Sequence, residues 1–377
     1  MNVICLKENL KRNLDNALRI IKYNSTLPIL NNFLLSIEKG MLKISSTDLE
    51  IGFTSLVSSK VLKEGNITVP AQLLSQFVNN LPNNKNINLE VNDLKLYLSC
   101  DNIKASINGL NADDFPIIPK IKNDSVLTVS SKILKNSLNC VVNSSAISDS
   151  RPEISSVFIK INPDQIKFIA TDSFRLAHKT IFILSPDLKE KIKINFEKSK
   201  DIILPIRTAV ELLRILGDQD DNVKIIIDEN QILFDLDNTQ LISRLIEGNY
   251  PDYEAIIPKS SETKCYLMKN DLEESIKLAG CFSSKLNDVT IKTNSEKSQM
   301  EILGSNSEYG HHRAKIDSEI TGKDVSIVFN WHYLLDGLKN IDSDELILEF
   351  NGDLKPAVIK PAKNSDFFYI LMPIKNS

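Results

Sequence analysis

The side chains that could do acid–base or metal chemistry are few and scattered in this 377-residue sequence. Four histidines, His178, His311, His312 and His332, would have to supply any imidazole catalysis, and the sequence gives them no recognisable partners. His311 and His312 are adjacent, so on a strand their side chains would face opposite ways and could not ligate one metal ion together. A solvated strand end or a loop is the structure that this pair favours.

The acidic clusters do not form a metal loop either. Asp218, Asp220 and Asp221 resemble the start of a calcium loop, but the sixth position is Val223, where the sharp turn needs glycine. We interpret this cluster as a solvated turn. Asp113 and Asp114 could be a metal-binding or acid–base pair, although the proline that follows them favours a connector.

Cysteine and glycine usage argue against a metal or a phosphate-bearing cofactor. The five cysteines are never spaced Cys-x-x-Cys, which is typical of reduced thiols that pack in the core, with a metal site as the lesser alternative. Only 12 residues are glycine, and neither Gly-x-Gly-x-x-Gly nor a Walker-type run occurs. The sequence therefore predicts no catalytic residues, no metal and no cofactor.

Composition excludes several classes of protein. Apolar residues make up 42% and charged residues 25%, as in folded globular proteins. The net charge of −4 would repel a polyanion, so any nucleic-acid role must rest on local patches. The N-terminus is charged, and no apolar run approaches the length of a membrane span. The sequence therefore predicts a cytoplasmic protein with no membrane segment.

The chain repeats itself three times, beginning with an amphipathic helix predicted over 7–22. Its apolar stripe returns in two later segments, predicted as helices over 130–144 and 269–282. The three stripes are Leu10, Leu14, Ala17, Leu18 and Ile21; Leu134, Leu138, Val141 and Val142; and Leu272, Ile276 and Ala279.

A second class of helix confirms the period. It begins at Pro70, Pro205 and Asn330, and positions 4, 8 and 11 after each start are apolar in all three copies. Proline suits the first helical turn, where its missing N–H costs nothing. A strand follows each of these helices, at 87–91, 223–227 and 346–350, and paired strands lie between the two helices of each copy, at 35–45, 157–170 and 289–304.

The repeats and two proline-containing connectors define the domains. The connectors are 115–119 and 250–258, because proline blocks helix and ladder continuation. We predict an α+β fold of three similar domains at 1–119, 120–258 and 259–377. Chance similarity among ordinary α+β segments is the alternative.

Positive charge concentrates on some of the six predicted helices. Helix 7–22 carries a net +3, helix 130–144 +2 and helix 205–217 +1; helices 70–81 and 330–341 are neutral and helix 269–282 is −1. If all helices line one face, that face can accept phosphates. The alternative is that Lys and Arg merely solvate the helices. Aromatic residues are only 6%, so single-strand stacking is not indicated.

Short motifs in this order resemble one family over essentially the whole chain. They are Leu27-Pro28-Ile29-Leu30, Thr47-Asp48-Leu49-Glu50, Asp114-Phe115-Pro116, Ala170-Thr171-Asp172-Ser173-Phe174-Arg175-Leu176-Ala177, Tyr250-Pro251-Asp252-Tyr253 and Met372-Pro373-Ile374. The sequence is similar to the bacterial DNA sliding clamps, the β subunits of the replicative DNA polymerase III holoenzyme.

The resemblance implies a DNA clamp fold in which antiparallel sheets lie outside and helices line a ring. Two copies would join head to tail as a homodimer that encircles and slides on duplex DNA without reading its sequence. Such a non-catalytic processivity factor tethers the replicative polymerase α subunit, the clamp loader and other proteins with a clamp-binding motif. Covalent DNA continuity, rather than tight contact, would hold the ring in place.

The resemblance also implies a peptide-binding cleft between the second and third domains. Its matching residues are Thr171, Arg175, Leu176, Pro251, Ile256, Ile370, Met372, Pro373 and Ile374. Branched and thioether side chains beside prolines suit an apolar pocket, and core packing is the alternative for Leu176. Ser173, Phe174 and Ala255 depart from the family's usual residues, so the peptide preference is expected to differ.

Two further surfaces follow from the resemblance and from the charge of the helices. The DNA-facing residues are Asn24, Arg151, Lys11, Arg12, Lys135 and Arg207, although the family often has a basic residue where Asn24 stands. The dimer interface should use Leu110 in the first domain and Cys281 and Phe282 in the third. Related clamps often carry carboxylates where this chain has His311-His312-Arg313, so the interface is a candidate for pH sensitivity.

Two other classes of function remain open to the sequence. A repeat-built scaffold would bind proteins without DNA, and a circular plasmid would separate it from a clamp. An enzyme would require nucleotide turnover that a point substitution abolishes.

Overall fold

The computed structural model describes residues 1–22, 27–121, 125–148, 150–185, 188, 190–196, 198–217, 220–363 and 366–375. The chain divides into two compact units. The first consists of Met1–Leu134, Lys189–Glu197 and Val210–Leu245, and the second of Lys135–Leu188, Lys198–Ala209 and Ile246–Ser377. No helix in the described part of the chain is long and apolar enough to cross a membrane.

All six predicted helices are present, with ends that lie slightly inside the predicted ranges. They are α1 (Lys7–Ile20), α2 (Ala71–Asn79), α3 (Ser131–Val142), α5 (Ile206–Ile215), α6 (Lys269–Gly280) and α7 (Trp331–Lys339). The ends differ because the flanking residues serve as caps. At the start of α7, for example, the Asn330 side chain accepts hydrogen bonds from the backbone N–H groups of His332 and Tyr333.

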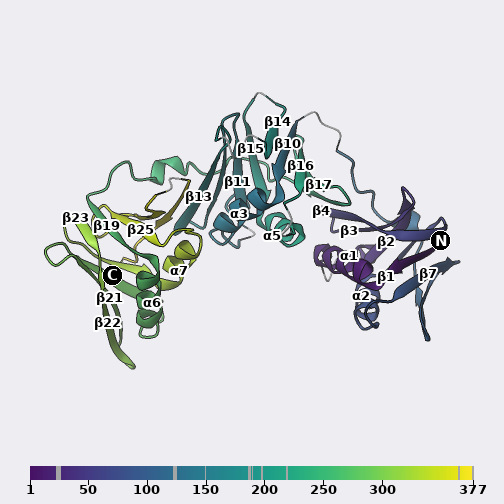
Figure 1. The fold of residues 1–377 in the computed structure, drawn as a ribbon, viewed down its shortest axis with the longest axis horizontal. Helices are drawn as coiled ribbons and strands as arrows, with labels where there is room; N and C mark the ends of the chain where they lie inside the picture. Colours follow the sequence, from purple (N-terminus) through teal and green to yellow (C-terminus); the bar gives the residue numbers. More distant parts are fainter. Residues whose placement is uncertain are drawn as a thin grey trace. The chain divides into compact units, whose positions relative to one another are not determined.

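The first unit contains a five-stranded and a nine-stranded antiparallel sheet. The five-stranded sheet has the order β5 (Ser59–Lys63), β1 (Asn2–Leu6), β7 (Asn86–Asn92), β8 (Lys95–Cys100) and β9 (Ile103–Asn108). The nine-stranded sheet has the order β14 (Ile192–Ile194), β10 (Val126–Ser130), β16 (Asn222–Ile227), β17 (Gln231–Leu236), β18 (Thr239–Arg244), β4 (Ile51–Val57), β3 (Met41–Thr47), β2 (Asn32–Glu38) and β6 (Asn66–Pro70). Helices α1 and α2 lie side by side (Figure 1), and α1 buries Leu10, Leu14 and Ala17.

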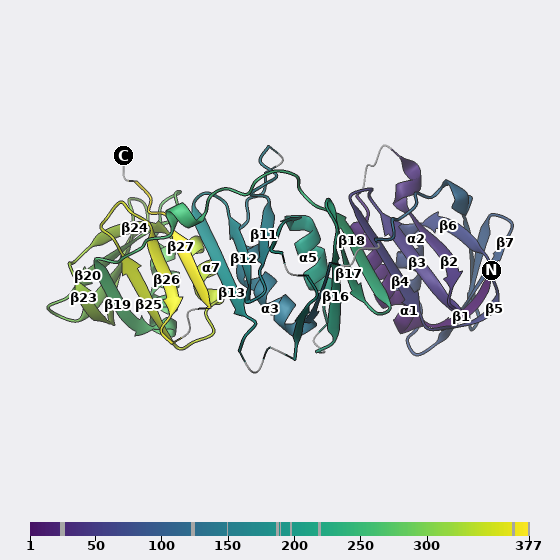
Figure 2. The same ribbon diagram turned by 90° about the horizontal axis from the view of Figure 1, so that it is seen from above.

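The second unit contains a nine-stranded and a four-stranded antiparallel sheet. The nine-stranded sheet has the order β15 (Lys200–Pro205), β11 (Ser156–Ile161), β12 (Gln165–Thr171), β13 (Arg175–Phe182), β27 (Phe367–Leu371), β26 (Ala357–Pro361), β25 (Glu345–Phe350), β19 (Thr263–Met268) and β23 (Glu319–Gly322). The four-stranded sheet has the order β22 (Gly310–Asp317), β21 (Gln299–Asn306), β20 (Asp288–Asn294) and β24 (Ser326–Asn330). Figure 2 shows β12, β13, β27, β26 and β25 side by side.

Backbone hydrogen bonds repeat with the predicted period. The amide of Leu110 donates to the carbonyl of Thr68 over 2.9 Å, that of Ile246 to Ile203 over 3.0 Å, and that of Ile374 to Val328 over 2.8 Å. Each acceptor lies two positions before the predicted start of the second helix in its copy. The last strand of every copy is therefore anchored at the same place.

The strand orders show how one copy is joined to the next. In the two nine-stranded sheets, four strands of one copy (β6-β2-β3-β4 or β15-β11-β12-β13) continue into five of the next (β18-β17-β16-β10-β14 or β27-β26-β25-β19-β23). We call the pairings β4–β18 and β13–β27 the internal joints. The remaining sheets, β24-β20-β21-β22 and β9-β8-β7-β1-β5, are the same four-strand and five-strand halves without a partner half in the described chain.

Candidate functional site

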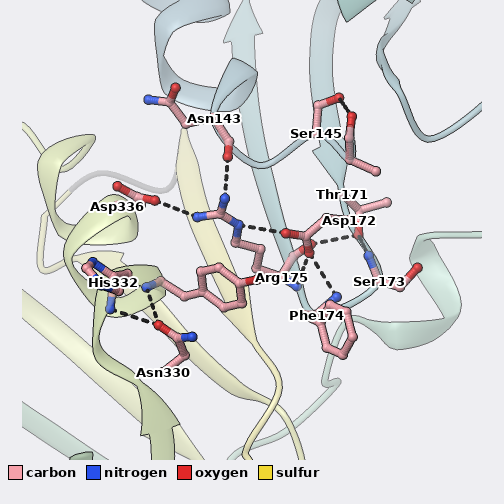
Figure 3. Close-up of polar contacts among 12 residues, drawn as sticks. Asn143, Ser145, Thr171, Asp172, Ser173, Phe174, Arg175, Asn330, His332 and Asp336 are labelled. Carbon is pink, nitrogen blue, oxygen red and sulfur yellow. Dashed lines mark hydrogen bonds and ion pairs between the residues drawn. The ribbon is translucent and has the colours of Figure 1, made fainter. Parts of the chain in front are cut away.

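A rigid turn connects β12 to β13 at the internal joint of the second unit (Figure 3). The Asp172 carboxylate accepts hydrogen bonds from the backbone N–H groups of Phe174 and Arg175, each at 2.9 Å. The Thr171 hydroxyl donates to the carbonyl of Arg175 over 2.7 Å and accepts from the N–H of Ser173. Ser173 has a φ of 77°, in the left-handed region that favours glycine. The turn holds the Phe174 side chain 60% exposed.

The Arg175 guanidinium points away from the tip of this turn toward the helices (Figure 3). Its Nε donates to Asp172 over 2.9 Å, Nη1 to Asp336 over 2.7 Å and Nη2 to the carbonyl of Asn143 over 2.6 Å. The Tyr333 ring centroid lies 4.2 Å from the guanidinium carbon. Burial acts to lower the pKa of Arg175, but Tyr369 and the two carboxylates outweigh it and raise that pKa. Arg175 therefore binds α7 to β13, and every nitrogen of its side chain is engaged within the chain.

Leu176 and Ile370 form the buried floor of the site. They pair across β13 and β27 and are 0% and 1% exposed. Both belong to a core cluster whose other buried members are Phe158, Ile169, Ile203, Tyr253 and Val358. The alternative considered for Leu176, core packing, therefore describes its position in this structure.

The other predicted peptide-site residues lie around this floor. The Met372 amide donates to the carbonyl of Phe174 over 2.8 Å, so the segment after β27 runs beside the turn. Met372 is 37% and Ile256 44% exposed. Thr171 is buried, Pro373 and Ile374 are half-buried, and Pro251 is exposed between Tyr250 and Tyr253, which pack on the core cluster. Met372, Ile256 and Phe174 form what we call the apolar rim.

His178, on β13, is a core residue. Its ring stacks on Phe368 with centroids 4.5 Å apart and is 6% exposed. Burial, followed by the nearby Lys167, lowers the pKa of His178 from 6.5 to about 4. The imidazole is therefore neutral at physiological pH and is not placed for acid–base chemistry.

This buried histidine makes stability depend on pH. Because the pKa is lower in the folded than in the unfolded state, the unfolded chain takes up the proton first as the pH falls from 6.5 toward 4. We expect the free energy of unfolding to fall by about 2 kcal/mol from this group between pH 7 and pH 5. Urea unfolding at both pH values measures it. His178→Phe should remove this difference and His332→Gln should retain it; an unchanged difference in His178→Phe would contradict the assignment.

The first unit carries the same turn with a different surface. Asp48 accepts from the N–H groups of Glu50 and Ile51, Leu49 has the same φ of 77°, and the Arg244 amide donates to the carbonyl of Glu50 over 2.9 Å. A cavity of about 200 Å³ lies there. Gly52 stands in place of Leu176, and Arg244 in place of Met372, so the two joints share a backbone but differ in chemistry.

The predicted DNA-facing residues are distributed over several elements. On α1, Lys11 is half-buried at the flank of the buried Leu10 and Leu14, and Arg12 is exposed on the opposite side. Lys135 on α3 and Arg207 on α5 are half-buried. Arg151 is exposed and donates to the Ser173 hydroxyl over 3.2 Å, next to the turn. Asn24 lies outside the described residues.

The predicted interface residues lie at the two unpaired sheet halves. Leu110 follows β9 and is 48% exposed. Cys281 is exposed at the end of α6, and the neighbouring Phe282 stacks on His312 of β22 with centroids 5.9 Å apart. His311 is exposed on the same strand, where Arg313 pairs with Glu301 instead.

Some of the residues that contact Arg175 could not be found from the sequence. Asp172 was visible as part of the Thr-Asp motif, but Asp336 and Tyr333 belong to the third copy of the repeat and carry no local signal. Asp220, interpreted above as part of a solvated turn, is exposed, and it also accepts a hydrogen bond from Ser130 and pairs with Lys191. Asp218 lies outside the described residues. All five cysteines are free, and among the described residues no group of three or more His, Cys, Asp or Glu side chains could hold a metal ion.

Comparison with known proteins agrees with this architecture. Models of the DNA polymerase III beta subunit match residues 1–119 (N-terminal domain), 128–252 (central domain) and 254–375 (C-terminal domain). The beta sliding clamp of Staphylococcus epidermidis is 27% identical over 373 residues, 96% of each chain. The sliding clamp of Pseudomonas aeruginosa, crystallised with a ligand, and that of Bartonella birtlesii, bound to griselimycin, superpose over 100% of both chains with TM-scores of 0.91 and 0.90 at 25% identity.

The three-domain α+β fold is therefore that of a DNA clamp, as predicted. The chain belongs to the DNA polymerase III β subunit family, the bacterial sliding clamps. Its function is that of a processivity factor for DNA polymerase in DNA replication, and a ring that binds partner proteins is inherent to the family.

Proposed function

We propose that two copies of this chain close head to tail into a ring around duplex DNA, with domains at 1–119, 120–258 and 259–377. The ring slides without reading sequence and has no catalytic activity, metal or cofactor of its own. It acts in the cytoplasm, away from the membrane. It tethers the replicative polymerase α subunit, the clamp loader and other proteins with a clamp-binding motif through the apolar rim.

The matching sheet halves carry the proposal of a closed dimer. The order β24-β20-β21-β22 corresponds to β6-β2-β3-β4, and β9-β8-β7-β1-β5 corresponds to β18-β17-β16-β10-β14. Pairing β22 of one copy with β9 of another would make a third kind of nine-stranded sheet by the rule of the two internal joints. It would also satisfy two unpaired edges, which otherwise invite aggregation. A heterologous contact of this kind closes into a ring when the rotation allows it.

Basic helices support the proposed DNA path. Helix α1 has four basic and two acidic residues, α3 has two basic and no acidic residues, and α5 has two basic and one acidic residue. We assign phosphate contacts to Lys11, Arg12, Lys135, Arg207 and Arg151, and retain Asn24 in the same role. A modest charge suits sliding, because weak phosphate attraction centres the duplex without holding it.

The apolar rim and its floor support the proposed peptide site. Exposed Met372 and Phe174 lie next to the strands that carry the buried Leu176 and Ile370, and exposed Ile256 hydrogen-bonds through its amide to Tyr253 of the core cluster. Thr171, Pro251, Pro373 and Ile374 complete the lining, and Arg175 supports it from the helix side. Peptide anchors in such a surface contribute about 2 kcal/mol each.

Substitution of Met372 tests the peptide site. Met372→Lys should weaken binding of the polymerase α subunit's clamp-binding peptide roughly 10- to 100-fold, because a charge replaces an apolar contact. Met268→Lys, which changes a methionine 45% exposed at the end of β19, is the matched control and should bind as the parent does. Fluorescence anisotropy with the labelled peptide measures both. Equal affinities for the two variants would contradict the site.

Two measurements test the ring. The mass in solution should be twice the 42.4 kDa of one chain. After loading onto a circular plasmid, the protein should stay through gel filtration and leave once the plasmid is linearised. A stable monomer at micromolar concentration, or equal retention on circular and linear DNA, would contradict the proposed ring.

A further inference from the structure

The internal joint of the second unit includes a contact between two helices. The Asn340 side chain, at the C-terminal cap of α7, donates to the backbone oxygen of Cys140 in α3 over 2.9 Å. It also bonds the carbonyl of Asp336 in its own helix over 3.2 Å. Nearer the start of α7, Tyr333 packs under Arg175. Helix α7 is thus held to α3 by a hydrogen bond from a side-chain amide and to β13 by an aromatic–guanidinium contact.

Helix α2 repeats α7 residue by residue. Both have nine residues, so Ala71 at the start of α2 corresponds to Trp331 at the start of α7. Asn80 caps α2 as Asn340 caps α7, with φ and ψ of −86° and −5° against −91° and 0°. The Asn80 side chain bonds the carbonyl of Gln76 over 2.8 Å, as Asn340 bonds that of Asp336. Asn80 is exposed, and Leu73 occupies the place of Tyr333.

Helix α6 repeats α3 in the same way. Both have 12 residues, and Leu278 is the tenth residue of α6 as Cys140 is of α3. The turn before β22 begins as the Asp172 turn does, since Asn306 accepts from the N–H groups of Glu308 and Tyr309. It is one residue longer, because Ser305 pairs with His311 whereas Thr171 pairs with Leu176. Tyr309 therefore stands where Arg175 stands when counted from β21, and Gly310 does when counted from β22.

These equivalent positions are large exposed apolar residues. Leu73 is 50%, Leu278 55% and Tyr309 71% exposed. Leu278 lies on α6, which packs on β22, and Tyr309 lies in the turn before β22; Leu73 lies on α2, in the unit whose five-stranded sheet ends at β9. Exposed apolar side chains gathered at matching positions indicate a surface that another copy covers.

We propose that the joint between two copies is an uncharged version of the β13–β27 internal joint. This inference rests on the ring proposed above. Asn80 of one copy donates to the backbone oxygen of Leu278 of the other, and Leu73 packs against Tyr309. The partner is a second copy of this chain, because its own α6 and β22 supply the surface that α2 and β9 fit. The contact that corresponds to Arg175–Asp336 contains no ion pair, so its contribution to dimerisation is independent of salt.

Truncation of Leu73 tests the apolar contact. Leu73→Ala should weaken each joint about tenfold, and hence the dimer of two joints about a hundredfold, at both low and high salt, about 0.05 M and about 0.5 M. Leu62→Ala is the matched control. It removes a leucine 54% exposed on β5, which lies at the edge opposite β9 in the five-stranded sheet, and it should dimerise as the parent does. Analytical ultracentrifugation measures the dissociation constants. Loss in Leu73→Ala that appears at low salt only would overturn the uncharged contact.

Removal of the Asn80 amide tests the hydrogen bond. Asn80→Ala should weaken the dimer about 25-fold, or about fivefold per joint. Asn79→Ala removes the same group at the neighbouring position, where the amide bonds Asp15 within the chain, and should leave the dissociation constant unchanged. If the parent is a dimer and both Leu73→Ala and Asn80→Ala match it, this joint is wrong and the ring stands. A monomeric parent would instead refute the ring itself.

Discussion

Arg175→Met should lower the free energy of unfolding of the second unit by about 3 kcal/mol, because stranding a largely buried charge costs more than the pair itself contributes. The substitution removes the guanidinium from two carboxylates whose side chains, Asp172 and Asp336, are only 13% and 27% exposed. The carbonyl of Asn143 loses its donor as well. Urea unfolding at pH 7 measures the loss, read against the unaltered chain.

Two further variants distinguish the cost of leaving buried carboxylates without a partner from the cost of losing an ordinary ion pair. Lys355 pairs with Glu262 at the surface, where the two side chains are 67% and 50% exposed, so Lys355→Met should cost no more than about 1 kcal/mol. Asp336→Asn combined with Arg175→Met should recover part of the loss, since one stranded charge is gone. Equal losses in Arg175→Met and Lys355→Met would show that Arg175 does not hold the joint.

Ser106→Pro should convert the dimer to a monomer and abolish retention on circular DNA. The Gly109 amide donates to Leu94 of the segment before β8, and N–H groups alternate along a strand, so the amide of Ser106 faces away from β8. Proline there breaks no bond within its own sheet but removes a donor from the free edge and obstructs pairing. Because a closed ring has two such joints, the dissociation constant should rise by roughly a hundredfold or more.

Ser106→Ala is the control, because it removes the exposed hydroxyl and keeps the amide. It should stay dimeric and remain on circular plasmid. A thermal midpoint of Ser106→Pro close to that of Ser106→Ala would show that the monomer is folded. A folded, dimeric Ser106→Pro would exclude β9 as the interface strand.

The fold was accessible from the sequence because its signals are local and repeated. Apolar spacing indicated each helix, and the three matching starts at Pro70, Pro205 and Asn330 indicated the order of the elements. Helix ends were less accessible, since the apolar Leu81 and Ile341 extend the helical spacing past Asn80 and Asn340, which cap α2 and α7. Sheet order was not predictable, because β13 pairs with β27, a strand near the other end of the second unit's sequence.

The candidate site was only partly accessible for the same reason. Resemblance selected residues along the chain, and the structure brings Thr171, Leu176, Ile370 and Met372 to one joint. The resemblance could not show toward which face of the sheet each side chain points. Adjacent residues on a strand face opposite ways, so Leu176 enters the core cluster while Arg175 reaches α7.

The free edges of β9 and β22 determine where such a ring would part. A covalent connector spans each internal joint, so two strands that separate there remain at a high effective concentration and meet again quickly. No peptide bond crosses between β22 of one copy and β9 of the next. If this contact opens, only the second such contact of the ring still holds the two copies together. The β22–β9 contact is therefore the place where a duplex would enter.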